Sequence, residues 1–328
     1  AAPPHLKCVF PEVSPFDGFY SGNPNGIFWD LYLKQWQARI KALDMNDYHI
    51  TVPVDEDPAG AMLAAAVEEH KDNVDTYKVA QNMLYRNSWN AYSKVPTFLS
   101  TGDSFLTLVQ TSEIPMYHWS GWFDYFVFNQ PTWFPNLEQP QKLAIGPWVH
   151  TDRYGDTDLA AIEHLRWYDY WLKGIDNGIT KEAPVNYFTM GASEGREWRS
   201  AWDWPVPGIG STKYYLGAGS SGSVESLNDG KLSTKKPSSS SGQDVYVVDN
   251  FTLPLVDRWS STTMESLSVD WTALDNVSLT YTTAALKADT RITGYPVAHL
   301  WVSCNVTDAD FFVYLEEIDE NGVSTNVS

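Results

Sequence analysis

Positive charge is scarce in this sequence. Lysine and arginine number 22 against 41 aspartate and glutamate residues, so the formal net charge is −19, and charged residues make up only 19% of the chain. A polyanion repels nucleic acid and anionic membrane surfaces, which disfavours both as partners. Long apolar runs are also missing, because the longest aliphatic stretch, AMLAAAV, is far too short to cross a bilayer. We therefore expect neither a nucleic-acid partner nor a membrane partner.

Cysteine is nearly absent. Cys8 and Cys304 lie near opposite ends of the chain, so neither a disulfide framework nor a cysteine metal site can be built from them. Both stand in apolar strand-like runs, which favours buried free thiols over a bridge. The sequence also has no H-E-x-x-H motif and no glycine-rich phosphate loop. We expect no metal and no cofactor.

Aromatic residues, in contrast, are abundant, with 15 Trp, 18 Tyr and 14 Phe in 328 residues. This length suggests two or three domains. Because the chain lacks an initiator Met and ends inside a β-type pattern, we expect a fragment of a longer protein. Low lysine content and an acidic pI near 4.6 favour an exported protein. A cytoplasmic location and a homo-oligomer both stay open.

The first two-thirds of the chain alternates strands and helices. Apolar runs at 6–13, 114–122 and 141–148 predict buried strands, and apolar residues at helical spacing predict a helix over 158–174. This rhythm is typical of an α/β fold with a parallel sheet. The predicted stripe that packs this helix on the sheet is Leu159, Ile162, Leu165, Tyr168 and Leu172.

Residues 27–110 interrupt this pattern. Helical spacing of apolar residues is seen at 27–45 and 58–86, and Asp57 with Pro58 can begin the second stretch. We interpret 27–110 as a helical cap or lid insertion between two parts of the α/β core, 1–26 and 111–182.

Short strands alternate with turns in the last third of the chain, which predicts a β-sandwich or jelly roll over 183–328, truncated at its end. The predicted strands are KYYLG, DVYVVDN, LSVDW, VSLTYTTAAL, PVAHLWVSCNV and ADFFVYLEEID.

An acid and a histidine follow two neighbouring predicted strands. Asp124 comes after the aromatic run HWSGWF, and His150 comes after KLAIGPWV. The carboxyl ends of parallel strands open on one edge of a sheet, so the two side chains can meet there. An aspartate that accepts a hydrogen bond from a histidine fixes its tautomer and stabilises the imidazolium, which is the acid–base half of a nucleophilic triad. On position alone, a cap or a surface group is the commoner role for such residues.

A series of motifs follows one another over most of the chain. In order they are IPMYHWSGWFDYF, KLAIGPWVH, LRWYDYWLKGIDNGI, APVNYFTMG, EWRSAWDWP, YYLGAG, YVVD, LTYTTAALKADTRITGYPVAHLWVS and DADFFVYLEEIDENG. This series resembles the α/β-hydrolases of the cocaine esterase and X-prolyl dipeptidyl aminopeptidase family. The resemblance implies a partial α/β-hydrolase core, a cap and a carboxy-terminal jelly roll. It also implies that Asp124 is the triad acid and His150 the general base.

The nucleophilic serine is expected upstream of Ala1. The α/β-hydrolase order is Ser, then Asp, then His, and PPHLKCVFP resembles the segment just downstream of the nucleophile helix. Two other serines are weaker candidates. Ser193, in GASEG, fits G-x-S-x-G literally, but it follows the acid and the histidine, and no helix follows it. Ser120 lies on the same predicted strand as Asp124, where it is hard to aim at His150.

Four aromatic residues crowd the predicted site: Trp119, Trp122, Phe126 and Trp148. They are candidates to line the acyl or leaving-group pocket, although each can equally fill the core between layers. The resemblance favours Phe126 as the pocket residue.

The sequence thus predicts a serine hydrolase that acts on a small-molecule ester or amide. An X-Pro dipeptidyl peptidase with a peptide substrate is the alternative within the class. A non-catalytic carbohydrate-binding β-domain protein is the alternative from another class, and the chain by itself would then be inactive.

Overall fold

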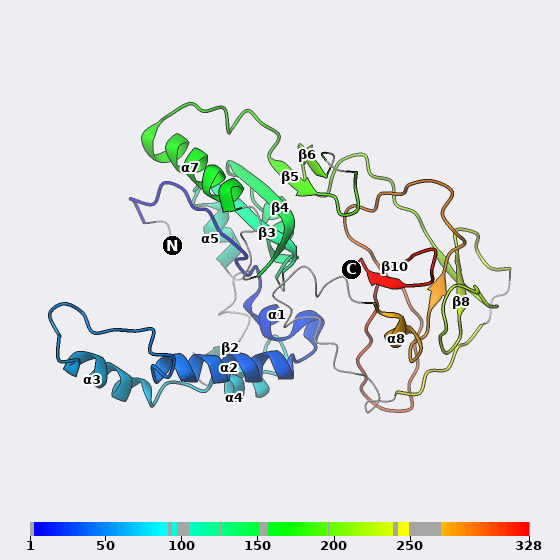
Figure 1. The fold of residues 1–328 in the computed structure, drawn as a ribbon, viewed down its shortest axis with the longest axis horizontal. Coiled ribbons are helices and arrows are strands. Elements are labelled where there is room, and N and C mark those ends of the chain that lie inside the picture. Colours follow the sequence, from blue (N-terminus) through cyan, green and yellow to red (C-terminus); the bar gives the residue numbers. More distant parts are fainter. Residues whose placement is uncertain are drawn as a thin grey trace. The chain divides into compact units, whose positions relative to one another are not determined.

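A computed structural model describes residues 3–90, 94–96, 105–124, 126–150, 157–193, 195, 197–238, 242–248 and 270–327 (Figure 1). The chain divides into two compact units. The first consists of Ala1–Pro3 and Ser14–Glu113, and the second of Pro4–Val13 and Ile114–Ser328. No helix in the described ranges has the length and apolar character that a membrane crossing requires.

The first unit is mainly helical. Its described elements are α1 (Gly18–Gly22), η1 (Pro24–Gly26), α2 (Asp30–Asp44), α3 (Ala61–His70), α4 (Thr76–Gln81), β1 (Trp89–Asn90), β2 (Val95–Pro96) and α5 (Leu106–Gln110). The predicted cap stretch at 58–86 forms two helices, because the Asp75 carboxylate accepts the Lys78 N–H and starts α4 as a separate helix. The Asp57 carboxylate accepts three backbone N–H groups at the start of α3. This contact gives Asp57 the capping role that the sequence suggested.

A four-stranded sheet forms the centre of the second unit. Its elements are β3 (Met116–Phe123), α6 (Asn129–Trp133), η4 (Phe134–Asn136), β4 (Gln141–Val149), α7 (Thr157–Lys173), β5 (Val185–Phe188) and β6 (Trp198–Ala201). The strand order is β3-β4-β5-β6, with β3, β4 and β5 parallel and β6 antiparallel to β5. The segment around Val9 and Glu12 bridges β3 on its free side in parallel. The predicted parallel sheet is confirmed.

The sheet extends further along the chain than the sequence suggested. The expected domain boundary fell between 182 and 183, yet β5 and β6 pair with β4 and with each other beyond it. The motifs APVNYFTMG and EWRSAWDWP are therefore sheet strands, with the GASEG turn between them. The alternation of apolar and polar residues could not distinguish β5 and β6 from the β-rich region that follows. The strands of the sheet and those of that region are all short apolar runs in the sequence.

Side chains that alternate along β3 and β4 build two cores, one on each face of the sheet. Tyr117, Trp119 and Ala144 face the core that α7 covers, and Leu143 and Ile145 face the other. The ribbon shows α7 lying along the sheet (Figure 1).

The predicted packing stripe of α7 is only partly correct, because Leu159 and Tyr168 pack against the core but the other three residues do not. Ile162, Leu165 and Leu172 are each more than half exposed, whereas Ala160 and Trp167 are buried in the core. The buried face of the helix also carries the carboxylate of Glu163. The face of α7 that packs on the sheet is therefore not the most apolar face of the helix.

The C-terminal region contains small sheets. Its described elements are β7 (Tyr215–Gly217), β8 (Gly230–Ser233), α8 (Thr272–Asp275), β9 (Tyr281–Thr282), β10 (Glu316–Ile318) and β11 (Ser324–Asn326). Strands β7, β8 and β9 form one sheet, and β10 pairs with β11. The predicted strand PVAHLWVSCNV has no ladder partner among the described residues, so its apolar side chains and Cys304 are exposed. The predicted strand LSVDW lies mostly outside the described residues.

Candidate active site

The turn after β3 holds Asp124 in a fixed orientation. The Asp124 amide donates to the Gly121 carbonyl at 3.1 Å, and its Oδ1 accepts the Phe126 N–H at 2.7 Å. Gly121 is required here, because a Cβ at this position would lie 2.1 Å from the Trp148 carbonyl oxygen. The carboxylate is almost fully buried, at 2% exposure. One carboxylate oxygen is thus occupied by its own turn, and Oδ2 is left for a second partner.

His150 is that partner. It directly follows β4, and its Nδ1 lies 2.9 Å from Asp124 Oδ2. The two residues leave neighbouring parallel strands at their carboxyl ends, as the sequence predicted for their positions. The His150 side chain is 37% exposed, whereas that of Asp124 is 1% exposed. The buried carboxylate therefore holds one ring nitrogen while the imidazole still reaches solvent.

Phe126 lies beside this pair. Its ring meets the His150 imidazole edge to face, with centroids 5.7 Å apart. Phe126 is partly exposed and belongs to the turn that carries Asp124. It is placed where it can restrict the ring of His150 and contact a bound molecule.

Trp119 and Trp148 do not line an open pocket. Both are nearly fully buried, and their rings stack at 4.4 Å and 12° in the core under α7. Trp122 packs on the opposite core, where its indole N–H donates to the Phe188 carbonyl at 2.7 Å. Trp119 and Trp148 are therefore core residues, whereas a pocket role for Trp122, which is only partly buried, stays a prediction.

Several other candidates lie away from this pair. Ser120 is 1% exposed, and its Oγ has no hydrogen-bond partner among the described residues. Ser193 is exposed in the turn between β5 and β6. His164, on α7, stacks on Phe10 at 3.7 Å and its Nε2 lies 3.0 Å from Glu12 Oε1, so its contacts are structural. In the described part of the chain, no group of three or more His, Cys, Asp or Glu side chains is arranged to hold a metal ion.

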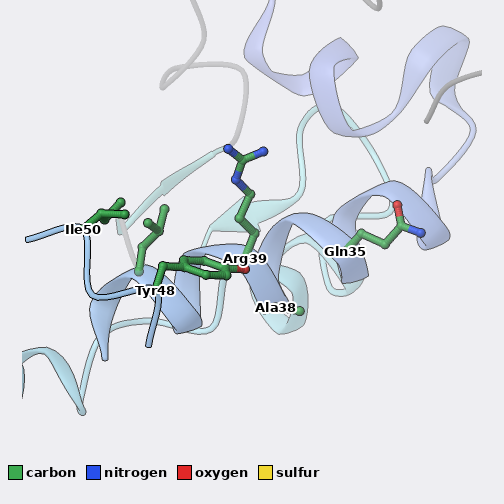
Figure 2. Close-up of a pocket in the computed structure, with 6 residues that line it drawn as sticks. Gln35, Ala38, Arg39, Tyr48 and Ile50 are labelled. Atoms are coloured by element: carbon green, nitrogen blue, oxygen red, sulfur yellow. The ribbon is translucent and has the colours of Figure 1, made fainter. Parts of the chain in front are cut away.

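The first unit carries a surface pocket of about 680 Å³ (Figure 2). It lies where α2 meets the chain that follows this helix, and it is lined by Gln35, Ala38, Arg39, Leu43, Tyr48 and Ile50. Figure 2 shows Gln35, Ala38 and Arg39 on the helix, with Tyr48 and Ile50 on the following segment. Its lining residues include no acid–base pair. The Asp124–His150 site is therefore the better candidate for a catalytic centre.

His118 is buried beneath α6. The residue is 1% exposed in the middle of β3, and its Nδ1 lies 2.9 Å from Gln130 Oε1. Burial lowers the pKa of His118 from 6.5 to about 4, although hydrogen bonds with Gln130 and Gln141 oppose this shift. His118 is therefore neutral at physiological pH. A histidine within an apolar strand is not distinguishable in sequence from any other core residue.

Acid should destabilise the α/β unit through His118. As the pH falls, the unfolded chain takes up a proton near pH 6.5, before the folded one does near pH 4. The contribution of neutral His118 to the free energy of unfolding is thus complete above pH 6.5. It decreases by about 3 kcal/mol as the pH falls towards 4. The measurement is urea unfolding at pH 7 and pH 4, compared with His118→Leu, which does not titrate. Equal losses in both proteins would contradict the prediction.

A parallel sheet with helical crossovers, in which an acid and a histidine leave neighbouring strands at their carboxyl ends, defines an α/β-hydrolase-type fold. Family comparisons agree with this class. Residues 1–152 match the family model described as X-Pro dipeptidyl-peptidase (S15 family), and residues 177–328 match that of the X-Pro dipeptidyl-peptidase C-terminal non-catalytic domain. The chain belongs to the cocaine esterase and X-Pro dipeptidyl-peptidase family of α/β-hydrolases.

Curated relatives come from several bacteria. A putative serine esterase of Mycobacterium bovis is 30% identical over 365 residues, covering 97% of this chain and 56% of the relative. Cocaine esterase of Rhodococcus sp. (strain MB1 Bresler) is 29% identical over 225 residues, covering 62% of this chain and 38% of the relative. A solved CocE/NonD family hydrolase of Staphylococcus aureus has 17% identity and a TM-score of 0.43, covering 70% of this chain and 35% of that one. The chain spans about half the length of the mycobacterial relative.

Proposed function

We propose that this chain supplies the acid and the base of a serine hydrolase that cleaves esters or amides by acyl transfer. The observation that carries the proposal is the 2.9 Å contact between Asp124 Oδ2 and His150 Nδ1 at the carboxyl edge of the sheet. The names of the relatives, a putative serine esterase and a cocaine esterase, support the reaction class.

In the proposed mechanism each group has its own step. Asp124 accepts the Nδ1–H of His150, so in this tautomer Nε2 carries the lone pair that takes the proton. The serine oxygen then attacks the carbonyl carbon of the substrate, and its proton passes to Nε2. His150 returns this proton to the leaving alcohol or amine. Water releases the acyl group by the same proton route, and no cofactor takes part.

We place the nucleophilic serine upstream of Ala1. The support is the Ser–Asp–His order of α/β-hydrolases, together with the burial of Ser120 and the turn position of Ser193. The proposal also keeps 27–110 as a cap and treats the region after β6, which is the rest of the predicted 183–328 domain, as a jelly roll. The continuous block that the first unit inserts into the second supports the cap, and the family model over 177–328 supports a separate non-catalytic role for most of the C-terminal region.

A fluorophosphonate probe tests the reaction class. We expect the full-length protein to be labelled at one serine upstream of Ala1, and the chain of residues 1–328 to remain unlabelled. A labelled peptide containing Ser120 or Ser193 would contradict the assignment. If no serine of the active full-length protein is labelled, the serine-hydrolase proposal is wrong.

The X-Pro dipeptidyl peptidase remains the second candidate, since both matched family models carry that description. A substrate panel separates it from an esterase. Rapid hydrolysis of p-nitrophenyl esters with inert Gly-Pro anilides would indicate an esterase, and the opposite preference would indicate the peptidase. If the full-length protein is inert towards both and binds oligosaccharides, the carbohydrate-binding alternative is supported instead.

A further inference from the structure

Helix α6 fixes the far end of the turn that carries Asp124. The Val127 N–H donates to the Asp124 carbonyl at 3.3 Å, and the Asn129 N–H donates to the Phe126 carbonyl at 2.9 Å. The Asn129 side chain donates to the same Phe126 carbonyl at 3.1 Å. These hydrogen bonds therefore link Asp124 and Phe126 to the chain that leads into α6.

This helix has too few residues to hold itself in place. It spans Asn129–Trp133, and helices much shorter than about 12 residues are marginal without tertiary contacts. Its first two residues, Asn129 and Gln130, are both 0% exposed. Burying two amide side chains is unfavourable unless they are hydrogen-bonded, so their presence here points to a specific polar contact.

Gln130 makes that contact with the strand beneath. Its Oε1 lies 2.9 Å from His118 Nδ1, and His118 belongs to the middle of β3, in register with Leu143 of β4. Because His118 is neutral, its one ring N–H can donate to Gln130. The turn that carries Asp124 is thus tied at one end to β3 by its backbone and at the other end to β3 by the His118–Gln130 pair.

We infer that Gln130 is a positioning residue for the proposed reaction, acting through the turn to hold Asp124 Oδ2 against His150. This inference rests on the proposed function of Asp124. Although the Tyr295 hydroxyl also donates to the Pro131 carbonyl of α6 at 3.2 Å, we expect loss of the His118 contact to shift α6 and the turn and to lengthen the 2.9 Å contact between Asp124 and His150. Misplacement of a catalytic group by about 1 Å costs up to about 100-fold in rate.

The test replaces Gln130 in the full-length protein. We expect Gln130→Leu to lower kcat by about 10- to 100-fold and to change KM much less, because Asp124 acts on the chemical step, and of the predicted pocket residues only Phe126 belongs to the turn that shifts. Gln130→Glu keeps an acceptor oxygen for His118 and should retain most of the kcat. If Gln130→Leu does not fold, the unbranched variant Gln130→Met carries the same prediction.

Two further measurements exclude a purely structural effect. Gln139→Leu is the matched control, since Gln139 is equally a buried glutamine but has no hydrogen-bond partner among the described residues. It should leave kcat unchanged. The downfield proton resonance of the hydrogen bond between His150 and Asp124 should weaken or shift in Gln130→Leu and stay in place in Gln139→Leu.

The outcomes separate this inference from the function on which it rests. If Asp124→Asn abolishes turnover while Gln130→Leu or Gln130→Met keeps a normal kcat and an unchanged resonance, the positioning role is wrong and the hydrolase assignment stands. Loss of kcat in Gln130→Glu equal to that in Gln130→Leu would also overturn the positioning role. If Asp124→Asn itself keeps normal turnover, the proposed function is wrong.

Discussion

Asparagine in place of Asp124 should lower the kcat of the full-length protein by about three to four orders of magnitude while the fold stays intact. The reason lies in the turn. The Phe126 N–H donates to Oδ1 at 2.7 Å, so an asparagine would place its oxygen there and turn its NH2 group towards His150. A donor facing Nδ1 favours the tautomer that carries its proton on Nε2. That tautomer cannot accept a proton from the serine.

The measurement is the kcat for a p-nitrophenyl ester, together with the melting temperature to confirm folding. Asp176→Asn is a suitable control, because Asp176 is exposed and pairs with Lys181 at the surface. The control should keep the wild-type kcat within about twofold, since exposed ion pairs contribute little. Normal turnover in Asp124→Asn would remove Asp124 from the mechanism.

The position of this pair could be predicted from sequence because it depends on topology. Two apolar strands, each followed by a polar side chain, are sufficient to bring Asp124 and His150 to one edge once the strands are parallel. The capping role of Asp57 could be predicted for a similar reason, since it depends on neighbours along the chain. Features set by local spacing or by sheet direction can be read from sequence.

Features that depend on a specific partner could not be predicted. Alternation places Trp119 on one face of β3, but only the structure pairs it with Trp148 in a closed stack. His118 illustrates the same limit, because its role depends on Gln130, which reaches it from another element. The fit of side chains between layers is decided by packing, which leaves no periodic signal.

The face of α7 that packs on the sheet was predicted only in part, for Leu159 and Tyr168, because a buried carboxylate also lies on it. Glu163 is 8% exposed, and its Oε2 accepts the Tyr117 hydroxyl at 2.8 Å. Its Oε1 accepts from Arg166 at 2.6 Å. Burial, with the adjacent Glu163 charge, raises the pKa of Tyr117 well above its usual range, so Tyr117 stays a hydrogen-bond donor. Apolar periodicity cannot anticipate a buried Tyr–Glu–Arg chain.

Glu163→Leu should therefore destabilise the α/β unit by about 2 to 4 kcal/mol, although it replaces a charge with an apolar side chain in the core. The substitution leaves the Tyr117 hydroxyl buried without its acceptor and removes a partner of Arg166, and an unsatisfied buried polar group costs about 1 to 3 kcal/mol. Urea unfolding followed by tryptophan fluorescence measures the loss, because Trp167 and Trp119 lie in this core.

The double-mutant cycle with Tyr117→Phe identifies the cause. Tyr117→Phe removes the hydroxyl group that has lost its acceptor in Glu163→Leu. The double variant should therefore be more stable than Glu163→Leu alone, and the coupling free energy between the two sites should be about 1 kcal/mol or more. If the two losses simply add, the hydroxyl–carboxylate contact does not stabilise this face of α7. Its packing must then be attributed to the apolar contacts of residues such as Trp167 and Ala160. A positive coupling would instead show that a polar contact, and not the most apolar stripe, decides how α7 docks behind the strands that carry Asp124 and His150.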